Sequence, residues 1–162
     1  MMIYLYHPSP LGPLLLGGEG ETLHFIGFPE GKGHIRPGDD WQQVPAAFAE
    51  ARAQLDDYFA GRRTEFDLPL QPHGTPFQIE VLQALQQIPY GETRSYRDIA
   101  QQLGRPNAVR AVGSANGRNP LPIVIPCHRV IAANGGLAGF GGGVQAKQFL
   151  LDLEQGRQPL PL

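Results

Sequence analysis

The residues most able to do chemistry lie together in the segment 123–131. Cys127 is the only cysteine in the chain, and His128 and Arg129 follow it directly. A thiolate is the nucleophilic form of cysteine. Because a free thiol has a pKa of about 8.5, it needs a neighbouring cation, base or dipole to ionise at neutral pH. His128 and Arg129 are candidates for that role, so the pattern predicts a nucleophilic cysteine.

The apolar residues before this trio predict how it is positioned. The run 123–125 consists of three β-branched residues, which predict a short buried strand. Pro126 lacks an N–H and is expected to end the strand, so that Cys127 lies at its exit. A lone cysteine beside a strand is more often a small core residue. Cys127 and His128 alone would favour that interpretation, and the surrounding sequence reverses it.

The sequence around Cys127 resembles that of the O6-alkylguanine-DNA alkyltransferases. The resemblance rests on Asn119-Pro120, the run 126–130 (Pro-Cys-His-Arg-Val), the glycine-rich segment 135–143 and the stretch from Lys147 to Glu154. It covers residues 74–162 well and the first seventy or so loosely. It implies repair of O6-alkylguanine in DNA, in which the damaged base is flipped out and its alkyl group is transferred irreversibly, in a single turnover, to the cysteine.

The resemblance also implies roles for individual residues. Cys127 would be the nucleophile, His128 would take its proton through a water, and Glu154 would orient His128. Asn119 would brace the turn before the cysteine. The Tyr96 hydroxyl would donate to N3 of the leaving guanine, which gains negative charge during the reaction.

A pocket for the flipped base follows from the same resemblance. The backbone carbonyls of Cys127 and Val130 would accept from the exocyclic amine, and the Gly141 N–H would donate to O6. Pro122 and Phe140 would form apolar walls. Many relatives have serine and tyrosine at positions 141 and 140, so this chain keeps the backbone donor and the aromatic wall but lacks two hydroxyls.

The glycine run 135–143 is not a phosphate-binding loop. It misses the third glycine of the dinucleotide fingerprint, and no Gly-Lys-Ser/Thr follows it. Glycines 139 and 141–143 carry no side chain, so we expect space beside Cys127 for a group as large as benzyl. A tryptophan at Gly142 is expected to close that space.

The segment 108–113 resembles the DNA-contacting helix of the family. Arg110 would be the finger that enters the base stack in place of the flipped nucleotide. The small residues of this helix would let it lie in the minor groove, which carries little sequence code. The other candidate DNA contacts are Ser95, Arg97, Ala111, Gly113, Ser114, Asn116, Arg118 and Arg129.

Capping signals predict the helices that would position these residues. Thr75 begins a capping box with proline at the first helical position, and Ser95 begins a second capped helix that ends at Gly104. Asn107 is expected to cap a third helix. The last two helices would form a helix-turn-helix, although a plain helical corner is at least as common.

The predicted fold class is α+β. Apolar segments at 3–6, 14–16 and 22–28 predict a small antiparallel sheet with a hairpin loop at 17–20, and 45–61 predicts a helix. We expect residues 1–72 to form a structural N-terminal α/β domain, in which nothing suggests chemistry. Residues 73–162 would form a mostly helical DNA-binding and alkyl-transfer domain, with a short strand bearing the nucleophile.

Charge and composition fit a DNA-binding protein of the cytoplasm. The net charge of −2 divides into −5 for residues 1–73 and +3 for 74–162, and six arginines lie between Arg94 and Arg129. Such clustering suits a phosphate backbone, although a solvated face would also account for it. No apolar run approaches the roughly twenty residues of a membrane helix. We expect a monomer that binds double-stranded DNA, with no metal, cofactor or membrane.

Two rival functions stay open at this point. A thiol hydrolase or a redox protein could use Cys127 and His128, but redox chemistry would expect a second cysteine and a hydrolase would expect its base far away in sequence. An alkyltransferase-like protein binds lesions without repairing them, yet such relatives lack the cysteine. The mass of the reacted protein separates these functions, because only a transferase keeps the substrate's alkyl group on Cys127.

Overall fold

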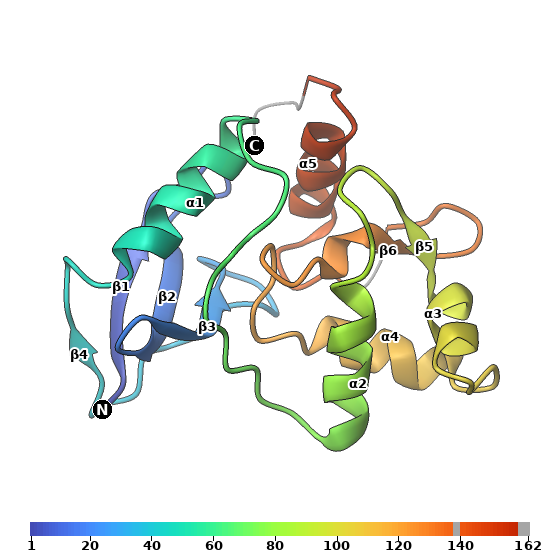
Figure 1. Ribbon diagram of the computed structural model, residues 1–162, viewed down its shortest axis with the longest axis horizontal. Coiled ribbons are helices and arrows are strands. Elements are labelled where there is room, and N and C mark those ends of the chain that lie inside the picture. The colour runs from blue at the N-terminus through green and yellow to red at the C-terminus, as the bar shows by residue number, and fades with distance from the viewer. Residues whose placement is uncertain (138–139, 159–162) are drawn as a thin grey trace.

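The N-terminal part of the chain forms a small sheet covered by one helix. The computed structural model describes residues 1–137 and 140–158. Its first strands are β1 (Ile3–His7), β2 (Leu14–Glu19), β3 (Thr22–Gly27) and β4 (Gln42–Gln43), and the first helix is α1 (Ala49–Phe59). The order in the sheet is β3-β2-β1-β4, antiparallel except for the β1–β4 pair (Figure 1). The predicted three-stranded antiparallel arrangement is therefore confirmed.

Two details of this part differ from the sequence prediction. The strand β2 continues to Glu19 through a bulge at Gly17 and Gly18, so the hairpin turn comes later than expected. The helix α1 begins at Ala49 and not at Pro45, because Phe48 adopts a left-handed backbone with φ 55° and buries its ring completely. The burial of the Phe48 ring thus sets the start of the helix, although Pro45 is the residue type that commonly begins one.

The rest of the chain is mostly helical. It contains α2 (Pro76–Leu85), β5 (Arg94–Ser95), α3 (Tyr96–Gln102), α4 (Val109–Gly117), the single-turn 3-10 helix η1 (Cys127–Arg129), β6 (Val130–Ile131) and α5 (Val144–Glu154). The helix α4 packs against both α2 and α3, and β5 pairs in parallel with β6 (Figure 1). This mixture of helices and a small sheet confirms the predicted α+β class. No helix within the described residues is long and apolar enough to cross a membrane.

The capping signals explain where two of these helices begin. Thr75 and Ser95 each form a complete capping box. The side-chain hydroxyl accepts from the backbone N–H three residues further on, and the side chain of that residue, Gln78 or Asp98, accepts from the backbone N–H of the cap. Gly104 follows α3 with φ 71°, as expected of a left-handed residue after a helix. The expected cap by Asn107 is wrong, because α4 is preceded by Ala108 without any side-chain cap.

The strand predicted before Cys127 is also wrong. Ile123 has φ 75°, and an isolated bridge joins Pro122 to Ile125, so this segment is a tight turn. Cys127 then begins η1, and the strand β6 comes after the cysteine. The run of β-branched residues is buried, as expected, but two prolines flank it and neither can donate to a ladder. The cysteine is therefore delivered by a buried turn and one turn of 3-10 helix.

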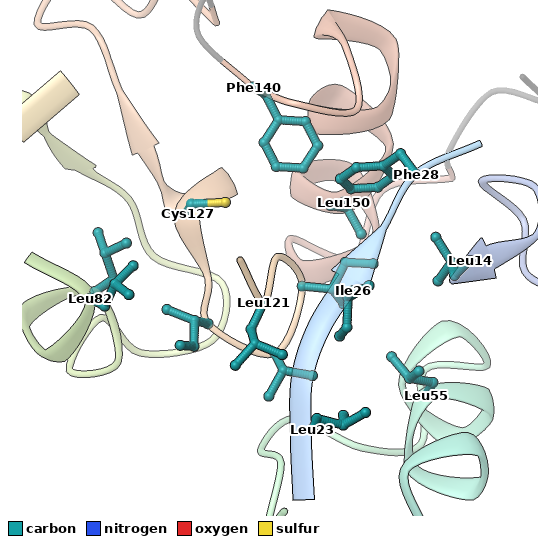
Figure 2. Close-up of a cluster of buried hydrophobic side chains, with 14 of the residues drawn as sticks. Leu14, Leu23, Ile26, Phe28, Leu55, Leu82, Leu121, Cys127, Phe140 and Leu150 are labelled. Carbon is teal, nitrogen blue, oxygen red and sulfur yellow. The ribbon is translucent and has the colours of Figure 1, made fainter. Parts of the chain in front are cut away.

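One hydrophobic cluster runs through both parts of the chain. It includes Leu14, Leu23, Ile26 and Leu55 from the N-terminal part and Leu82, Leu121, Cys127 and Leu150 from the remainder (Figure 2). Burial of apolar side chains is the dominant stabilising contribution in such a cluster. The two parts are therefore held together by a shared core, and the boundary between residues 72 and 73 stays a prediction.

Candidate active site

Cys127 is buried, and Asn119 holds the turn that precedes it in the chain. The Asn119 Nδ2 donates to the Ile125 carbonyl at 2.8 Å, and the Leu121 N–H donates to Asn119 Oδ1 at 2.9 Å. These contacts place Asn119 where the sequence predicted a brace. Burial raises the pKa of the Cys127 thiol to about 11, while a hydrogen bond from the Asn119 side chain and the charge of Lys147 act against this rise.

His128 and Glu154 form a buried pair beside the cysteine. The distance from His128 Nε2 to Glu154 Oε2 is 2.7 Å, and both side chains are buried. Burial lowers the pKa of His128, so its imidazole is neutral at neutral pH. A carboxylate only accepts hydrogen bonds, so we assign the proton to Nε2. Among the described residues, the buried Nδ1 has no hydrogen-bond partner, and its lone pair is free to accept a proton.

Arg129 belongs to the same network. Its Nε and Nη2 donate to the two oxygens of Glu154 at 2.8 and 3.0 Å, and its Nη1 donates to the Ile88 carbonyl at 2.7 Å. Burial works against ionisation of Glu154, but the hydrogen bonds and charges of His128 and Arg129 bring its pKa to about 2. Arg129 is buried and fully engaged, so the expectation that it contacts DNA is wrong.

The N-terminal part supplies a residue to this network. The Tyr58 hydroxyl, on α1, donates to Glu154 Oε2 at 2.6 Å and is completely buried. Sequence reasoning missed this contribution. A signal was present, because Ala51, Leu55 and Tyr58 share the buried face of the helix, and a tyrosine hydroxyl on such a face needs a hydrogen-bond partner.

A buried lysine is the cation near the thiol. Lys147 on α5 is fully buried, its Nζ donates to the Val130 carbonyl at 2.6 Å, and it lies 5.9 Å from the centre of the Tyr96 ring. Its positive charge lowers the pKa of Cys127. The sequence suggested His128 and Arg129 for this role. Lys147 could have been found from its place next to Ala146, Leu150 and Leu151 on the buried face of α5, because a lysine is almost never fully buried without a partner.

Tyr96 lies at the start of α3 with its ring half-buried. Burial raises the pKa of its hydroxyl, and the neighbouring Cys127 adds to this rise, so the group stays a hydrogen-bond donor. Gly113 of α4 packs near it, because an added Cβ at that position would lie 3.8 Å from the Tyr96 ring. The helix predicted to contact DNA, α4, therefore packs against Tyr96 of the site at Gly113.

The cysteine faces a cavity of about 310 Å3. Pro122 and Gly141, two of the residues predicted for the pocket, line it together with Cys127 and Asn119. Val130 and Phe140 are not among the lining residues, although both are buried. Figure 2 shows the Phe140 ring beside that of Phe28. The centres of the two rings are 5.4 Å apart.

The glycines expected to leave space beside Cys127 have different surroundings. Gly141 lines the cavity, whereas Gly139 lies outside the described residues. An added Cβ at Gly142 would lie 2.9 Å from the Phe140 ring and 3.0 Å from the Phe28 ring. A tryptophan at Gly142 would therefore displace two buried rings, one of which, Phe28, lines the cavity, and the expected closing of the space beside Cys127 stays a prediction.

The helix α4 presents one exposed face and one buried face. The exposed residues are Arg110, Ala111, Ser114, Gly117 and, at the C-cap, Arg118. Asn116 is buried, and its Nδ2 lies 3.3 Å from the Cys127 carbonyl, so the expected contact of Asn116 with DNA is wrong. On α3, Arg97 is exposed, and the Ser95 hydroxyl accepts from the Asp98 N–H as a cap.

No metal centre is apparent in the part of the chain that the structure describes. Within residues 1–137 and 140–158, no group of three or more His, Cys, Asp or Glu side chains is arranged to hold a metal ion. The described residues of the site supply a thiol, a neutral imidazole, a carboxylate and the two cations Lys147 and Arg129.

Known proteins are similar to this chain in sequence and in fold. Residues 76–156 match the family described as "6-O-methylguanine DNA methyltransferase, DNA binding domain", and residues 2–72 match "6-O-methylguanine DNA methyltransferase, ribonuclease-like domain". Methylated-DNA--protein-cysteine methyltransferase of Methanosarcina acetivorans is 51% identical over 94% of this chain and 98% of its own. The protein of that name from Mycobacterium tuberculosis is 50% identical over 100% of this chain and 98% of its own.

Solved structures agree with the sequence comparison. The crystal structure of Mycobacterium tuberculosis OGT in complex with DNA superimposes with a TM-score of 0.91 at 50% identity, and the match covers 98% of this chain and 96% of that chain. The crystal structure of Mycobacterium tuberculosis O6-methylguanine methyltransferase gives 0.90 at 51% identity, with the same coverage. Both the family matches and the full-length relatives lead to one conclusion: the chain belongs to the 6-O-methylguanine DNA methyltransferase family.

Proposed function

We propose that this protein repairs O6-alkylguanine in double-stranded DNA by transferring the alkyl group irreversibly to its own Cys127. The observation that carries the proposal is the buried Cys127 beside the His128–Glu154 pair at the wall of a cavity. Relatives at about 50% identity over the full length are named methylated-DNA--protein-cysteine methyltransferases. A thioether has no easy hydrolytic exit, so each molecule acts once.

The reaction is a displacement at the carbon bonded to O6. The Cys127 sulfur forms a bond to that carbon as the C–O6 bond breaks, and the electron pair stays on the guanine. The thiol proton passes through a water to His128 Nδ1, whose free lone pair supports this route. The imidazolium that forms is stabilised by Glu154, whose charge raises the pKa of His128.

Hydrogen-bond donors stabilise the leaving guanine. The Tyr96 hydroxyl, kept protonated by burial, donates to N3, and the Gly141 N–H donates to O6. The Val130 carbonyl accepts from Lys147, and a carbonyl has a second lone pair, so it can still accept from the exocyclic amine of guanine. The guanine anion leaves after taking up one proton from solvent, and the imidazolium of His128 returns the proton of the thiol to solvent, so protons and charge balance.

The exposed face of α4 binds the minor groove. Ala111, Ser114 and Gly117 keep this face slim, and Arg110 and Arg118 flank them as cations. Arg110 fills the gap left in the base stack by the flipped nucleotide, and α3 with α4 forms a helix-turn-helix. Arg97 on α3 adds a phosphate contact. The protein works as a monomer with little sequence preference, because the minor groove carries little code.

Incubation with a duplex that contains O6-methylguanine tests the proposal. Peptide mapping by mass spectrometry should find one methyl group on Cys127 and unmodified guanine in the DNA. An intact lesion bound tightly by an unmodified protein would contradict the proposal and would favour lesion binding without repair.

Replacing Arg110 with alanine should slow transfer from duplex DNA much more than transfer from free O6-benzylguanine. Only the duplex requires the flipped nucleotide to be replaced, and unstacking costs a few kcal/mol, so the duplex rate should fall on the order of tenfold or more. Single-turnover rates with both substrates measure this. Arg105→Ala, an exposed arginine before α4, is the control. Equal losses of rate with both substrates would contradict the role of Arg110 in replacing the flipped nucleotide.

Replacing Lys147 with methionine should make Cys127 less reactive. The charge of Lys147 lowers the pKa of the thiol, so its removal should raise that pKa above about 11. Each unit of the rise lowers the thiolate fraction about tenfold. The pH dependence of Cys127 alkylation by O6-benzylguanine should shift towards higher pH. Gln145→Met, at an exposed position of α5, should leave the profile in place; an unshifted profile for Lys147→Met would remove the lysine from the mechanism.

A further inference from the structure

The N-terminal part of the chain forms one wall of the cavity that contains Cys127. Its lining residues from this part are Phe25, Ile26, Phe28, Lys32, Gly33 and Ile35. The Cys127 sulfur points towards the side of β3 on which Ile26 and Phe28 lie (Figure 2). The cavity measures about 310 Å3, and in the proposed reaction it holds the flipped guanine together with its O6 substituent. The wall from the N-terminal part therefore borders the space that a substituent larger than methyl would enter.

Backbone hydrogen bonds fix this wall to the rest of the site. The Ile26 N–H donates to the Pro120 carbonyl at 2.9 Å, and the Gly33 N–H donates to the Gly141 carbonyl at 2.9 Å. The Phe28 N–H closes the loop by donating to the Gly33 carbonyl at 2.8 Å. An added Cβ at Gly33 would lie 3.0 Å from the Gly141 carbonyl, so this close approach requires a glycine. The wall is thus a fixed part of the site.

The charged residues at this cavity have one sign. Lys32 and Arg118 both line it, and none of its described lining residues is an aspartate or a glutamate. Lys32 is exposed, and its ammonium takes part in none of the hydrogen bonds or ion pairs among the described residues. Phe25, Ile35 and Pro122 supply apolar surface in the same cavity. An apolar cavity with cations at its edge complements a group that has an apolar body and an anionic end.

We infer that the cavity accepts O6 substituents with an apolar body and a carboxylate end, and that Lys32 selects for the carboxylate. The inference rests on the proposed transfer to Cys127. The sulfur bonds to the carbon attached to O6 as the C–O6 bond breaks, the electron pair stays on the guanine, and the thiol proton reaches His128. The carboxylate takes no part in the bond changes and only pairs with the Lys32 ammonium.

Free nucleobases test the inference without DNA phosphates. The rates of Cys127 alkylation by O6-(4-carboxybenzyl)guanine and by O6-benzylguanine are measured by mass spectrometry, and their ratio is compared between variants. Lys32→Gln should lower the ratio about fivefold, as expected for a partly exposed ion pair. Arg36→Gln removes a charge from the same loop at a residue that does not line the cavity, and it should leave the ratio unchanged.

Charge reversal makes the test sharper. Lys32→Glu should lower the carboxybenzyl ratio further and should raise the ratio for O6-(4-aminomethylbenzyl)guanine. Ratios that are the same in the wild type, Lys32→Gln and Lys32→Glu would overturn the inference. A Lys32→Gln variant that binds duplex DNA more weakly with an unchanged ratio would also overturn it, because the ammonium would then serve phosphates. Methyl transfer from an O6-methylguanine duplex to the wild type tests the proposed function separately.

Discussion

Replacing Cys127 with alanine should abolish alkyl transfer completely while the protein still binds duplex DNA. The thiol alone forms the bond to the alkyl carbon, whereas the exposed face of α4, which binds the duplex in our proposal, lies on another element. Alanine keeps the position apolar, and the cysteine is only 4% exposed, so the fold should tolerate the change with a small cavity. Peptide mapping after incubation with an O6-methylguanine duplex measures transfer, and a gel-shift titration measures binding.

Cys127→Ser is the matched variant. Its hydroxyl is a much weaker nucleophile than a thiolate and should also give no alkylated peptide. Any transfer by either variant would mean that another residue accepts the alkyl group. Loss of DNA binding in both variants, with an unchanged melting temperature, would mean that the thiol helps to hold the lesion.

Replacing Glu154 with glutamine should destabilise the protein and slow transfer. The carboxylate accepts from His128, Arg129 and Tyr58, and an amide would leave the Arg129 charge buried without its counter-ion. Breaking a buried pair in this way costs about 3–5 kcal/mol. Transfer should slow because His128 loses both its orienting acceptor and the charge that raises its pKa. The optimum pH for transfer should rise. His128 becomes a weaker base, so more of the Cys127 thiolate must form by direct ionisation of the thiol, which needs a higher pH.

Acid unfolding gives an independent measurement of the same contact. The pKa of Glu154 in the folded protein is about 2, below its ordinary 4.5, so its stabilising contribution is complete above pH 4.5 and is lost as the pH falls towards 2. The contribution is on the order of 3 kcal/mol. Urea unfolding at several pH values should show this loss in the wild type and not in Glu154→Gln. An equal slope in both would contradict the low pKa.

Two companion variants separate charge from hydrogen bonding. Tyr58→Phe removes one donor to Glu154 and leaves no buried charge unpaired, so it should cost only about 1 kcal/mol. Arg129→Met combined with Glu154→Gln removes both charges and should recover much of the stability lost in Glu154→Gln. If the double variant is no more stable than the single one, the ion pair is not the cause of the loss.

Local signals made part of this site predictable from the sequence. The contacts of Asn119 are of this local kind, whereas the pairing of His128 with Glu154 spans 26 residues and was predictable only through the family resemblance. The starts of α2 and α3 follow from capping boxes, which involve residues only three apart. Side chains that bond to their own neighbourhood leave a sequence signature because nothing distant is needed to satisfy them.

The features that could not be predicted depend on long-range contacts. Arg129 and Asn116 are polar and sit in an arginine-rich stretch, so the sequence suggested a surface role, yet the tertiary structure buries both against Glu154 and Cys127. The Tyr58–Glu154 bond and the cavity wall from β3 come from parts of the chain far from the motif. The run 123–125 showed burial but not backbone shape, because a buried turn and a buried strand share the same apolar pattern.

The Tyr58–Glu154 hydrogen bond also bears on when the protein becomes able to react. It joins residues 96 positions apart, and closing a loop of that length costs chain entropy before the contact is gained. The bond and the cavity wall formed by Phe28 and Gly33 therefore exist only after the N-terminal sheet has docked. A chain in which only the helices after residue 75 have folded could bind DNA before Tyr58 has reached Glu154. The hydrogen-bond network around His128 would then still be incomplete. Because Cys127 lies in the core shared with the N-terminal part and burial raises the pKa of its thiol, docking of the sheet would also shield the thiol of each molecule from electrophiles other than the substrate.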